Sequence, residues 1–163
     1  MRLMIVDDFR FIRRHIRALL GSIPGAEVVA EASSGAEAVA LARELRPDVV
    51  LMDISLQGMN GLLATETIRR ELPEVRVLIL SRHVEAEYVL RACRADACGY
   101  LPKCAIGREL GLALEALERG EAYFSPSIPR EELEYCADHL ADRDHPLARR
   151  QREVCAKSLE HSH

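Results

Sequence analysis

The sequence has no apolar run long enough to cross a membrane. Such a span needs about 18 consecutive apolar residues, whereas the apolar runs here are short, although 48% of the 163 residues are hydrophobic and 29% are charged. The amino end, MRLMIVDD, becomes acidic before the apolar region of a signal peptide develops. We therefore expect a cytoplasmic protein with no membrane partner.

Paired cysteine motifs are also missing. The five cysteines are odd in number and include no C-x-x-C pair, which argues against a zinc site or a disulfide framework. We expect free thiols in a reducing compartment. The cysteines are Cys93, Cys98, Cys104, Cys136 and Cys155.

An excess of basic residues is absent as well. Lys and Arg number 22 against 26 Asp and Glu, a net charge of -4, so the chain as a whole has no electrostatic footprint for nucleic acid. Its length suits one domain of ordinary size plus an appendage.

What the sequence does contain is a series of short apolar runs that alternate with segments of helical period. The runs are mostly continuous rather than alternating, which is typical of strands buried on both faces of a parallel sheet. They are Leu3–Val6, Val28–Ala30, Val49–Ile54, Val75–Leu80 and Gly99–Leu101.

The helical segments between these runs complete an α/β pattern. Ser34-Gly-Ala-Glu37 is a capping box that begins one of them. We predict a flavodoxin-like (βα)5 fold, a doubly wound five-stranded parallel sheet with helices on both faces, followed by a linker and a short C-terminal helix. The expected helices start at about Phe9, Ser34, Asn60, Glu85 and Ile106.

Polar residues stand at the carboxyl ends of these strands, where open α/β sheets bind ligands. Carboxylates gathered there repel one another unless a hard divalent cation and an ammonium group neutralise them. Mg²⁺ and Lys103 fit those two roles. A carboxylate nucleophile, a metal site, a lysine and a hydroxyl together suit phosphoryl transfer to an aspartate. The residues are Asp7, Asp8, Asp53, Ser81 and Lys103.

Four motifs carry a family resemblance: IVDD with Asp7 and Asp8, LMDISLQGMNG with Asp53, LILS with Ser81, and GYLPK with Tyr100 and Lys103. In this order and spacing, the sequence resembles a two-component response regulator, with a CheY-like receiver domain over about residues 1–121.

The resemblance implies a chemistry for each of these residues. Asp53 is then the phosphoacceptor, taking a phosphoryl group from a sensor histidine kinase. Mg²⁺ is held by Asp8, Asp53 and the backbone carbonyl of Ser55, and is positioned through water by Asp7. Lys103 pairs with the phosphoryl group.

The resemblance also implies a switch and partners. Ser81 moves to bond a phosphoryl oxygen, and Tyr100 rotates into the vacated space, so that the protein controls transcription in its full-length form. The kinase is expected near the first helix. Homodimerisation on phosphorylation is common in such proteins, through either the fourth and fifth or the first and fifth helices, and the sequence leaves that choice open.

Three positions depart from or vary the family pattern. Gln57 stands where relatives usually have proline, which leaves its loop less restricted. Asp96 stands where relatives often have glycine, at a backbone position that favours positive φ. We hypothesise that His83 tunes the lifetime of the phosphoaspartate; an exposed histidine with no role is the alternative.

Beyond residue 121 the organisation changes. Residues 122–144 read as a linker with a short amphipathic helix, Arg130–Ala141. Residues 146–154 resemble the opening of a LuxR-type helix-turn-helix domain, but no recognition helix follows. We expect residues 145–163 to be the truncated start of that domain plus a natural or vector-derived tail, so that DNA is reached only through an output domain largely absent here.

Two other functional classes stay open. A Mg²⁺-dependent phosphohydrolase of similar fold, with Asp53 as nucleophile, needs a general acid or base and a substrate pocket as well. A pseudo-receiver binds partners without phosphorylation, which the complete acidic set disfavours. Steady turnover of a small phosphate ester indicates the hydrolase, and single phosphorylation with slow decay indicates the receiver.

Overall fold

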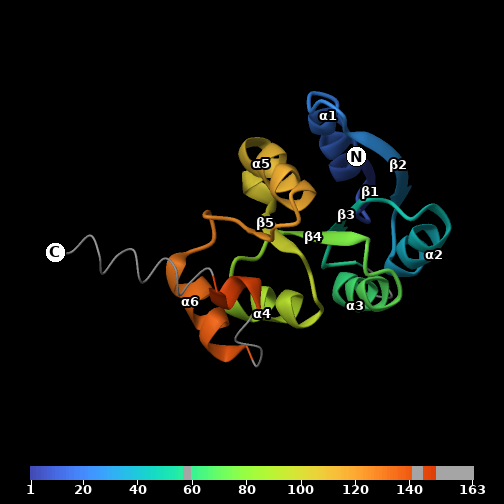
Figure 1. Ribbon diagram of the computed structural model, residues 1–163. Coiled ribbons are helices and arrows are strands. Elements are labelled where there is room, and N and C mark those ends of the chain that lie inside the picture. The colour runs from blue at the N-terminus through green and yellow to red at the C-terminus, as the bar shows by residue number, and fades with distance from the viewer. Residues whose placement is uncertain (57–59, 141–144, 150–163) are drawn as a thin grey trace.

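Parallel strands form the sheet at the centre of the molecule (Figure 1). In the computed structural model, which describes residues 1–56, 60–140 and 145–149, the sheet has six strands in the order β2-β1-β3-β4-β5-β6. The first five confirm the predicted strands. Their bounds are β1 Arg2–Val6, β2 Glu27–Ala32, β3 Val49–Asp53, β4 Arg76–Ser81, β5 Gly99–Pro102 and β6 Tyr123–Phe124.

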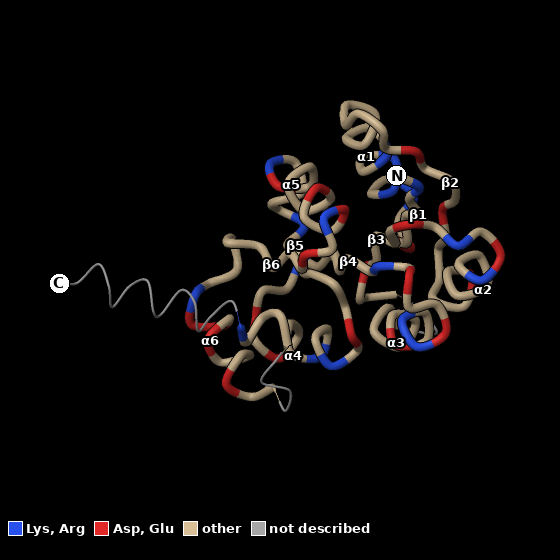
Figure 2. The backbone as a smooth tube through the Cα atoms, viewed as in Figure 1, with Lys and Arg blue, Asp and Glu red and all other residues tan. Residues whose placement is uncertain are grey.

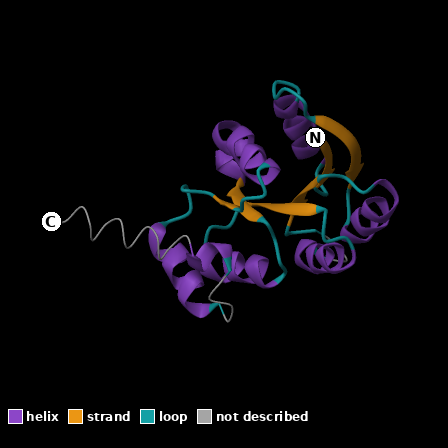
Figure 3. Cartoon of the chain, in the orientation of Figure 1, coloured by secondary structure: helices purple, strands orange, loops and turns teal. Residues whose placement is uncertain are grey.

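Helices cover both faces of this sheet, as predicted. Figure 3 shows α1 and α5 on one side, with α2, α3 and α4 on the other and α6 lying along α4. The Ser34 side chain accepts a hydrogen bond from the amide of Glu37, so the predicted cap of α2 is present. The bounds are α1 Arg10–Leu20, α2 Gly35–Leu45, α3 Gly61–Glu71, α4 Ala86–Arg94, α5 Ile106–Glu118 and α6 Arg130–His139, with a 3-10 turn at Lys103–Ala105.

The continuous apolar strands are explained by two cores, one on each face. Leu3 and Ile5 of β1 join a cluster with residues of α1 and α5, whereas Met4 and Val6 join a cluster with residues of α2, α3 and α4. All four side chains are buried. Because burial of one such side chain contributes about 1.5–3 kcal/mol, neither face of the strand tolerates polar residues before its carboxyl end.

A sixth strand, β6, extends the predicted five-stranded sheet at the β5 edge. Tyr123 and Phe124 pair in parallel with Gly99 and Tyr100 of β5, inside the segment that the sequence predicts to be a linker. A Cβ atom at position 99 would stand 2.3 Å from the carbonyl oxygen of Tyr123, so only glycine permits this approach. A two-residue strand is too short to show a periodic pattern, which is why the sequence did not reveal it.

A buried carboxylate secures the segment that contains β6. Glu109 of α5 accepts hydrogen bonds from the hydroxyl groups of Tyr123, Ser125 and Ser127 at 2.8, 2.7 and 2.5 Å. Burial raises the pKa of Glu109, but these three hydrogen bonds outweigh it and lower the pKa overall. Glu109 is therefore ionised when it binds the segment that contains β6.

Helix α6 also packs on the domain. Its buried residues Leu133 and Cys136 belong to the same core cluster as Val89, Leu90 and Cys93 of α4. The helix was predicted from its amphipathic pattern, and this contact shows what its apolar side covers.

The backbone at Asp96 and the length of the helices agree with the sequence analysis. Asp96 has a φ of 65°, as its replacement of a glycine predicts. Within the part of the chain that is described, every helix is too short or too polar to span a membrane.

Candidate functional site

Three carboxylates converge at the carboxyl edge of the sheet. Asp53 ends β3, and Asp7 and Asp8 follow β1, its neighbour in the sheet. Each offers an oxygen atom within 4.8 Å of the others. The strand order reverses between β1 and β3, and this topology brings the three residues together.

One cation reaches this group from the end of β5. The Lys103 ammonium lies 2.8 Å from Asp7 Oδ2 and 3.5 Å from Asp53 Oδ1. With three carboxylates ionised and one ammonium, the cluster carries a charge of 1 − 3 = −2. Asp7 and Asp53 are only 1% and 4% exposed, so water does little to offset this charge.

The cluster fits a divalent metal ion. Asp8 Oδ1 is buried and has no hydrogen-bond partner among the described residues, which is costly for a carboxylate oxygen unless a cation binds it. The donors are hard carboxylate oxygens, the type that Mg²⁺ prefers. Asp8 and Asp53 could hold such an ion directly, with Asp7 beside them.

Electrostatics at Asp53 reflect this crowding. Burial raises the pKa of its carboxyl group, and the negative charges of Asp7 and Asp8 act in the same direction. The Lys103 ammonium and the amide of Ser55 oppose them, and the net shift is upward. A metal ion would favour the ionised carboxylate that a nucleophile requires.

Backbone groups orient the carboxylates. Asp7 Oδ1 accepts a hydrogen bond from the amide of Phe9, and Asp53 Oδ1 accepts one from the amide of Ser55 at 3.2 Å. The Arg13 guanidinium donates to the carbonyl oxygen of Asp7 at 2.6 Å. These bonds fix the chain where β1 and β3 end.

Gly61 lets α3 begin directly against the end of β3. A Cβ atom at this position would lie 2.0 Å from the carbonyl oxygen of Asp53. The sequence analysis did not predict roles for Gly61 and Arg13. The close approach of α3 to β3 at Gly61 and the hydrogen bond from Arg13 to the Asp7 carbonyl leave no local pattern in the sequence.

Ser81 ends β4, the strand beside β3, and Tyr100 lies in β5, the next strand of the sheet. Both side chains are buried, and the Tyr100 hydroxyl donates to the carbonyl oxygen of His83 at 2.8 Å. Burial raises the pKa of Tyr100, while a hydrogen bond to the Ser81 side chain acts in the opposite direction. Ser81 Oγ also accepts from the amide of His83.

Two other predicted residues lie at the periphery of the site. Ser55 is exposed and contacts Asp53 through its amide. The His83 ring stacks on Tyr88 with centroids 4.1 Å apart, and lies 3.7 Å from a carboxylate oxygen of Glu85. Gln57 lies outside the described residues.

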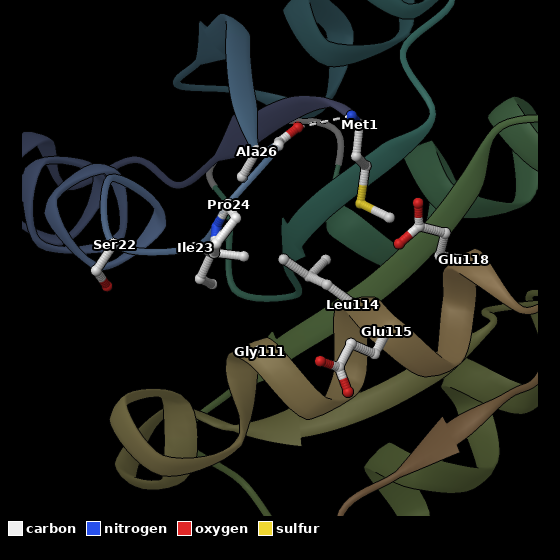
Figure 4. Close-up of a pocket in the computed structure, with 10 residues that line it drawn as sticks. Met1, Ser22, Ile23, Pro24, Ala26, Gly111, Leu114, Glu115 and Glu118 are labelled. Carbon is white, nitrogen blue, oxygen red and sulfur yellow. Dashed lines mark hydrogen bonds between the residues drawn. The ribbon is translucent and has the colours of Figure 1, made fainter.

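A cavity of about 430 Å³ lies at the opposite edge of the sheet. Figure 4 shows it between Met1 and the loop from Ser22 to Ala26 on one side and Leu114 and Glu118 of α5 on the other. Because Met1 precedes β1, this cavity is at the amino ends of the strands and does not serve the carboxylates.

All the residues of this site lie in a region that matches a known protein family. The family model described as the response regulator receiver domain matches residues 3–115. The chain belongs to the response regulator receiver domain family. The match includes Asp7, Asp8, Asp53, Ser81, Tyr100 and Lys103 within its bounds.

A curated relative of this receiver domain is also a response regulator. The chain is 36% identical over 127 residues to the response regulator protein VraR of Staphylococcus aureus, covering 78% of this chain and 61% of VraR. It therefore spans about three fifths of the length of that curated relative.

Solved structures agree with the fold. A two-component response regulator of the LuxR family from Aurantimonas sp. SI85-9A1 is 40% identical, with a TM-score of 0.78, and covers 82% of this chain and 96% of that chain. The receiver domain of the putative response regulator NarL from Mycobacterium tuberculosis is 31% identical, with a TM-score of 0.70, over 74% and 97%. The predicted fold and family are thus confirmed.

Proposed function

We propose that Asp53 accepts a phosphoryl group from a sensor histidine kinase and that the resulting conformational change is the output of the domain. The observation that carries this proposal is the cluster itself, in which the Asp53 carboxylate lies with two further carboxylates and the Lys103 ammonium group. Among the described residues, one buried oxygen of this cluster, Asp8 Oδ1, has no hydrogen-bond partner. A cytoplasmic location is part of the proposal.

The residues divide the work of phosphoryl transfer. Asp53 attacks phosphorus through Oδ1 or Oδ2, the bond from phosphorus to the donor nitrogen breaks, and the donor imidazole leaves. Lys103 neutralises charge on the transferred group. Bound Mg²⁺, held by Asp8, Asp53 and the carbonyl of Ser55 with Asp7 beside them, would supply charge neutralisation for the remaining phosphoryl oxygens.

Ser81 and Tyr100 are suited to report the modification. The Ser81 hydroxyl can donate to a phosphoryl oxygen while its oxygen still accepts from the amide of His83. Tyr100 supports the carbonyl of that same residue. We therefore assign them the switch role, and keep His83 as the residue that tunes the lifetime of the phosphoaspartate.

Turnover distinguishes this function from a phosphohydrolase. Incubation with Mg²⁺ and a small acyl phosphate should release phosphate only as fast as the phosphorylated protein decays, and a phosphate monoester should not be hydrolysed. Sustained hydrolysis of the monoester, many equivalents per chain, would instead support the hydrolase.

The kinase is expected to dock beside α1. Ile16 of α1 is buried in the core, whereas Phe9 and Phe11, at the start of this helix, are 58% and 80% exposed. Basic residues accompany them on α1, which has no acidic residue (Figure 2). Arg10 and Arg14 are exposed there and suit an acidic rim on the partner.

For homodimerisation the structure favours α1 and α5. The edge of β5 that faces away from β4 pairs with β6, and α6 packs on α4. The chain itself therefore covers much of the alternative dimer face, which α4 and α5 would form. Leu112 of α5 is 57% exposed and lines a groove of about 310 Å³ together with Leu19 and Ile23 near the end of α1. We propose a second copy as its occupant.

Replacing Leu112 with Glu should lower the association constant of the phosphorylated dimer at least about tenfold, because a charge would enter an apolar contact. Sedimentation equilibrium measures this, with Leu63→Glu on α3 as the matched control, since Leu63 is 48% exposed. Equal dimerisation of the two variants would contradict this face.

Control of transcription belongs to the longer protein. The proposal assigns residues 1–121 to the receiver domain, 122–144 to the connecting segment, and 145–163 to the start of an output domain. Most of that last segment lies outside the described residues. DNA contact therefore rests on the part of the relatives' length that this chain does not span.

A further inference from the structure

Helix α4 begins without a cap of its own. Its N-cap residue, Glu85, makes no side-chain bond to the first turn, and its carboxylate accepts from the amide of Val84 instead. The first amides of a helix need acceptors from outside the helix. One of them, the amide of Ala86, donates to Glu132 Oε2 of α6 at 2.6 Å.

Glu132 therefore caps α4 from another helix, 46 residues away in sequence. A carboxylate at this position also interacts favourably with the positive end of the helix dipole. The Ala86 amide is buried with its residue, so loss of the carboxylate would leave a donor without an acceptor.

The same residue of α4 receives a second bond from α6. The Cys136 Sγ–H donates to the carbonyl oxygen of Ala86 at 3.1 Å, in a buried contact. Leu133 completes the apolar side of α6 against α4. Both hydrogen bonds to Ala86 and the apolar contact form only when α6 is docked.

Residues 81–86 lead from the proposed phosphorylation site to the start of α4, and their first part is held at that site. Ser81 Oγ accepts from the amide of His83 at 3.0 Å, and the Tyr100 hydroxyl donates to the carbonyl of His83 at 2.8 Å. Three residues after His83, Ala86 makes both of its bonds to α6. This segment thus contacts the switch residues at one end and α6 at the other.

We propose that docking of α6 on α4 is thermodynamically coupled to phosphorylation of Asp53 through residues 81–86, with Glu132 as the positioning residue. This inference rests on the function proposed above. In the structure, residues 81–86 have the conformation in which α6 is docked on α4. A phosphoryl oxygen that accepts a hydrogen bond from Ser81 would stabilise this conformation further. Phosphorylation should therefore strengthen docking, and docking should favour phosphorylation by the same factor.

The coupling would transmit the phosphorylation state beyond the receiver. Helix α6, Arg130–His139, lies within residues 122–144, the proposed connection to an output domain. A segment that binds more tightly to α4 after phosphorylation changes the freedom of whatever follows it in the chain.

Cys136 supplies a direct measure of docking. Its side chain is 0% exposed, and burial raises the pKa of its thiol to about 11, so it reacts with a maleimide only when α6 opens. Cys104 is exposed and serves as an internal reference. Labelling at each cysteine can be followed by peptide mass spectrometry.

The experiment compares the 163-residue chain with Mg²⁺ alone and with Mg²⁺ plus acetyl phosphate, and records the intact mass of the same samples. The phosphorylated protein should label several-fold more slowly at Cys136, with Cys104 unchanged. Glu132→Ala should label about twofold to thirtyfold faster at Cys136, the range expected for loss of a helix cap, and should form the adduct more slowly.

Matched variants separate coupling from a general loss of structure. Glu134→Ala is on the same helix, pairs with Arg130 on the surface and should leave both rates unchanged. Glu132→Gln keeps the side-chain shape and should lie between the wild type and Glu132→Ala.

The outcomes distinguish this inference from the function on which it rests. If the adduct forms but Cys136 labels equally fast in both states, or if Glu132→Ala phosphorylates as fast as the wild type, the coupling is wrong and the phosphoacceptor function stands. If no adduct forms on the wild type, the proposed function itself fails, and the coupling fails with it.

Discussion

Replacing Lys103 with Ala should lower the rate of Asp53 phosphorylation by acetyl phosphate about 100-fold, the usual cost of removing one group that stabilises transition-state charge. Its ammonium lies 2.8 Å from Asp7 Oδ2 and 3.5 Å from Asp53 Oδ1. The rate can be measured by intact mass against time at fixed Mg²⁺.

The composition argues that an ammonium, not merely a positive charge, is needed at this position. The sequence has two lysines, Lys103 and Lys157, among its 22 basic residues, so arginine is used almost everywhere else. A compact ammonium fits beside two buried carboxylates where a planar guanidinium does not. We therefore expect Lys103→Arg to be nearly as slow as Lys103→Ala.

The control is Arg82→Ala, which removes an exposed cation next to Ser81 without touching the cluster, and which should phosphorylate at close to the wild-type rate. Undiminished phosphorylation of Lys103→Ala would remove Lys103 from the mechanism.

Replacing Asp53 with Asn should stabilise the metal-free protein by about 1 to 3 kcal/mol at neutral pH, within the usual range for single substitutions. The wild type holds three carboxylates in a cluster that has a charge of −2 and little access to water. Asparagine has the same shape and can still accept from the amide of Ser55, but it removes one buried charge.

The pH dependence of this difference follows from the raised pKa of Asp53. A carboxyl group with a higher pKa in the folded state holds more protons there than in the unfolded chain, so stability falls as pH rises through the interval between the two values. The advantage of Asp53→Asn should thus be absent below the ordinary aspartate pKa, appear across that interval and stay constant above it.

Urea unfolding at a series of pH values measures this difference, and Mg²⁺ provides the second arm. The ion should stabilise the wild type, because it binds the folded carboxylates, and should have a smaller effect on Asp53→Asn. Asp48→Asn, outside the cluster, is the control. A variant less stable than the wild type at neutral pH would contradict the electrostatic account.

The sequence predicted the elements that repeat a local pattern. Continuous apolar runs gave the first five strands, and the capping box at Ser34 gave the start of α2. Strand ends then placed Asp7, Asp8, Asp53 and Lys103 at one edge of the sheet, because parallel strands present their carboxyl ends together.

Long-range contacts were beyond such patterns. Strand β6 has two residues and depends on the close approach that Gly99 allows. The capping of α4 by Glu132 joins residues 46 positions apart, and an amphipathic helix does not indicate which surface it covers. The pairing of Lys103 with Asp7 at a shorter distance than with Asp53 is likewise a property of the folded site.

The central claim is that Asp53 accepts a phosphoryl group, and intact mass spectrometry after incubation with acetyl phosphate tests it most directly. The account predicts a single base-labile phosphoryl adduct that requires Mg²⁺, that is absent from Asp53→Asn, and that forms normally on the control Asp96→Asn, whose side chain is 70% exposed. A folded wild-type protein that binds Mg²⁺ and gains no adduct, or an adduct that persists in Asp53→Asn, would contradict it.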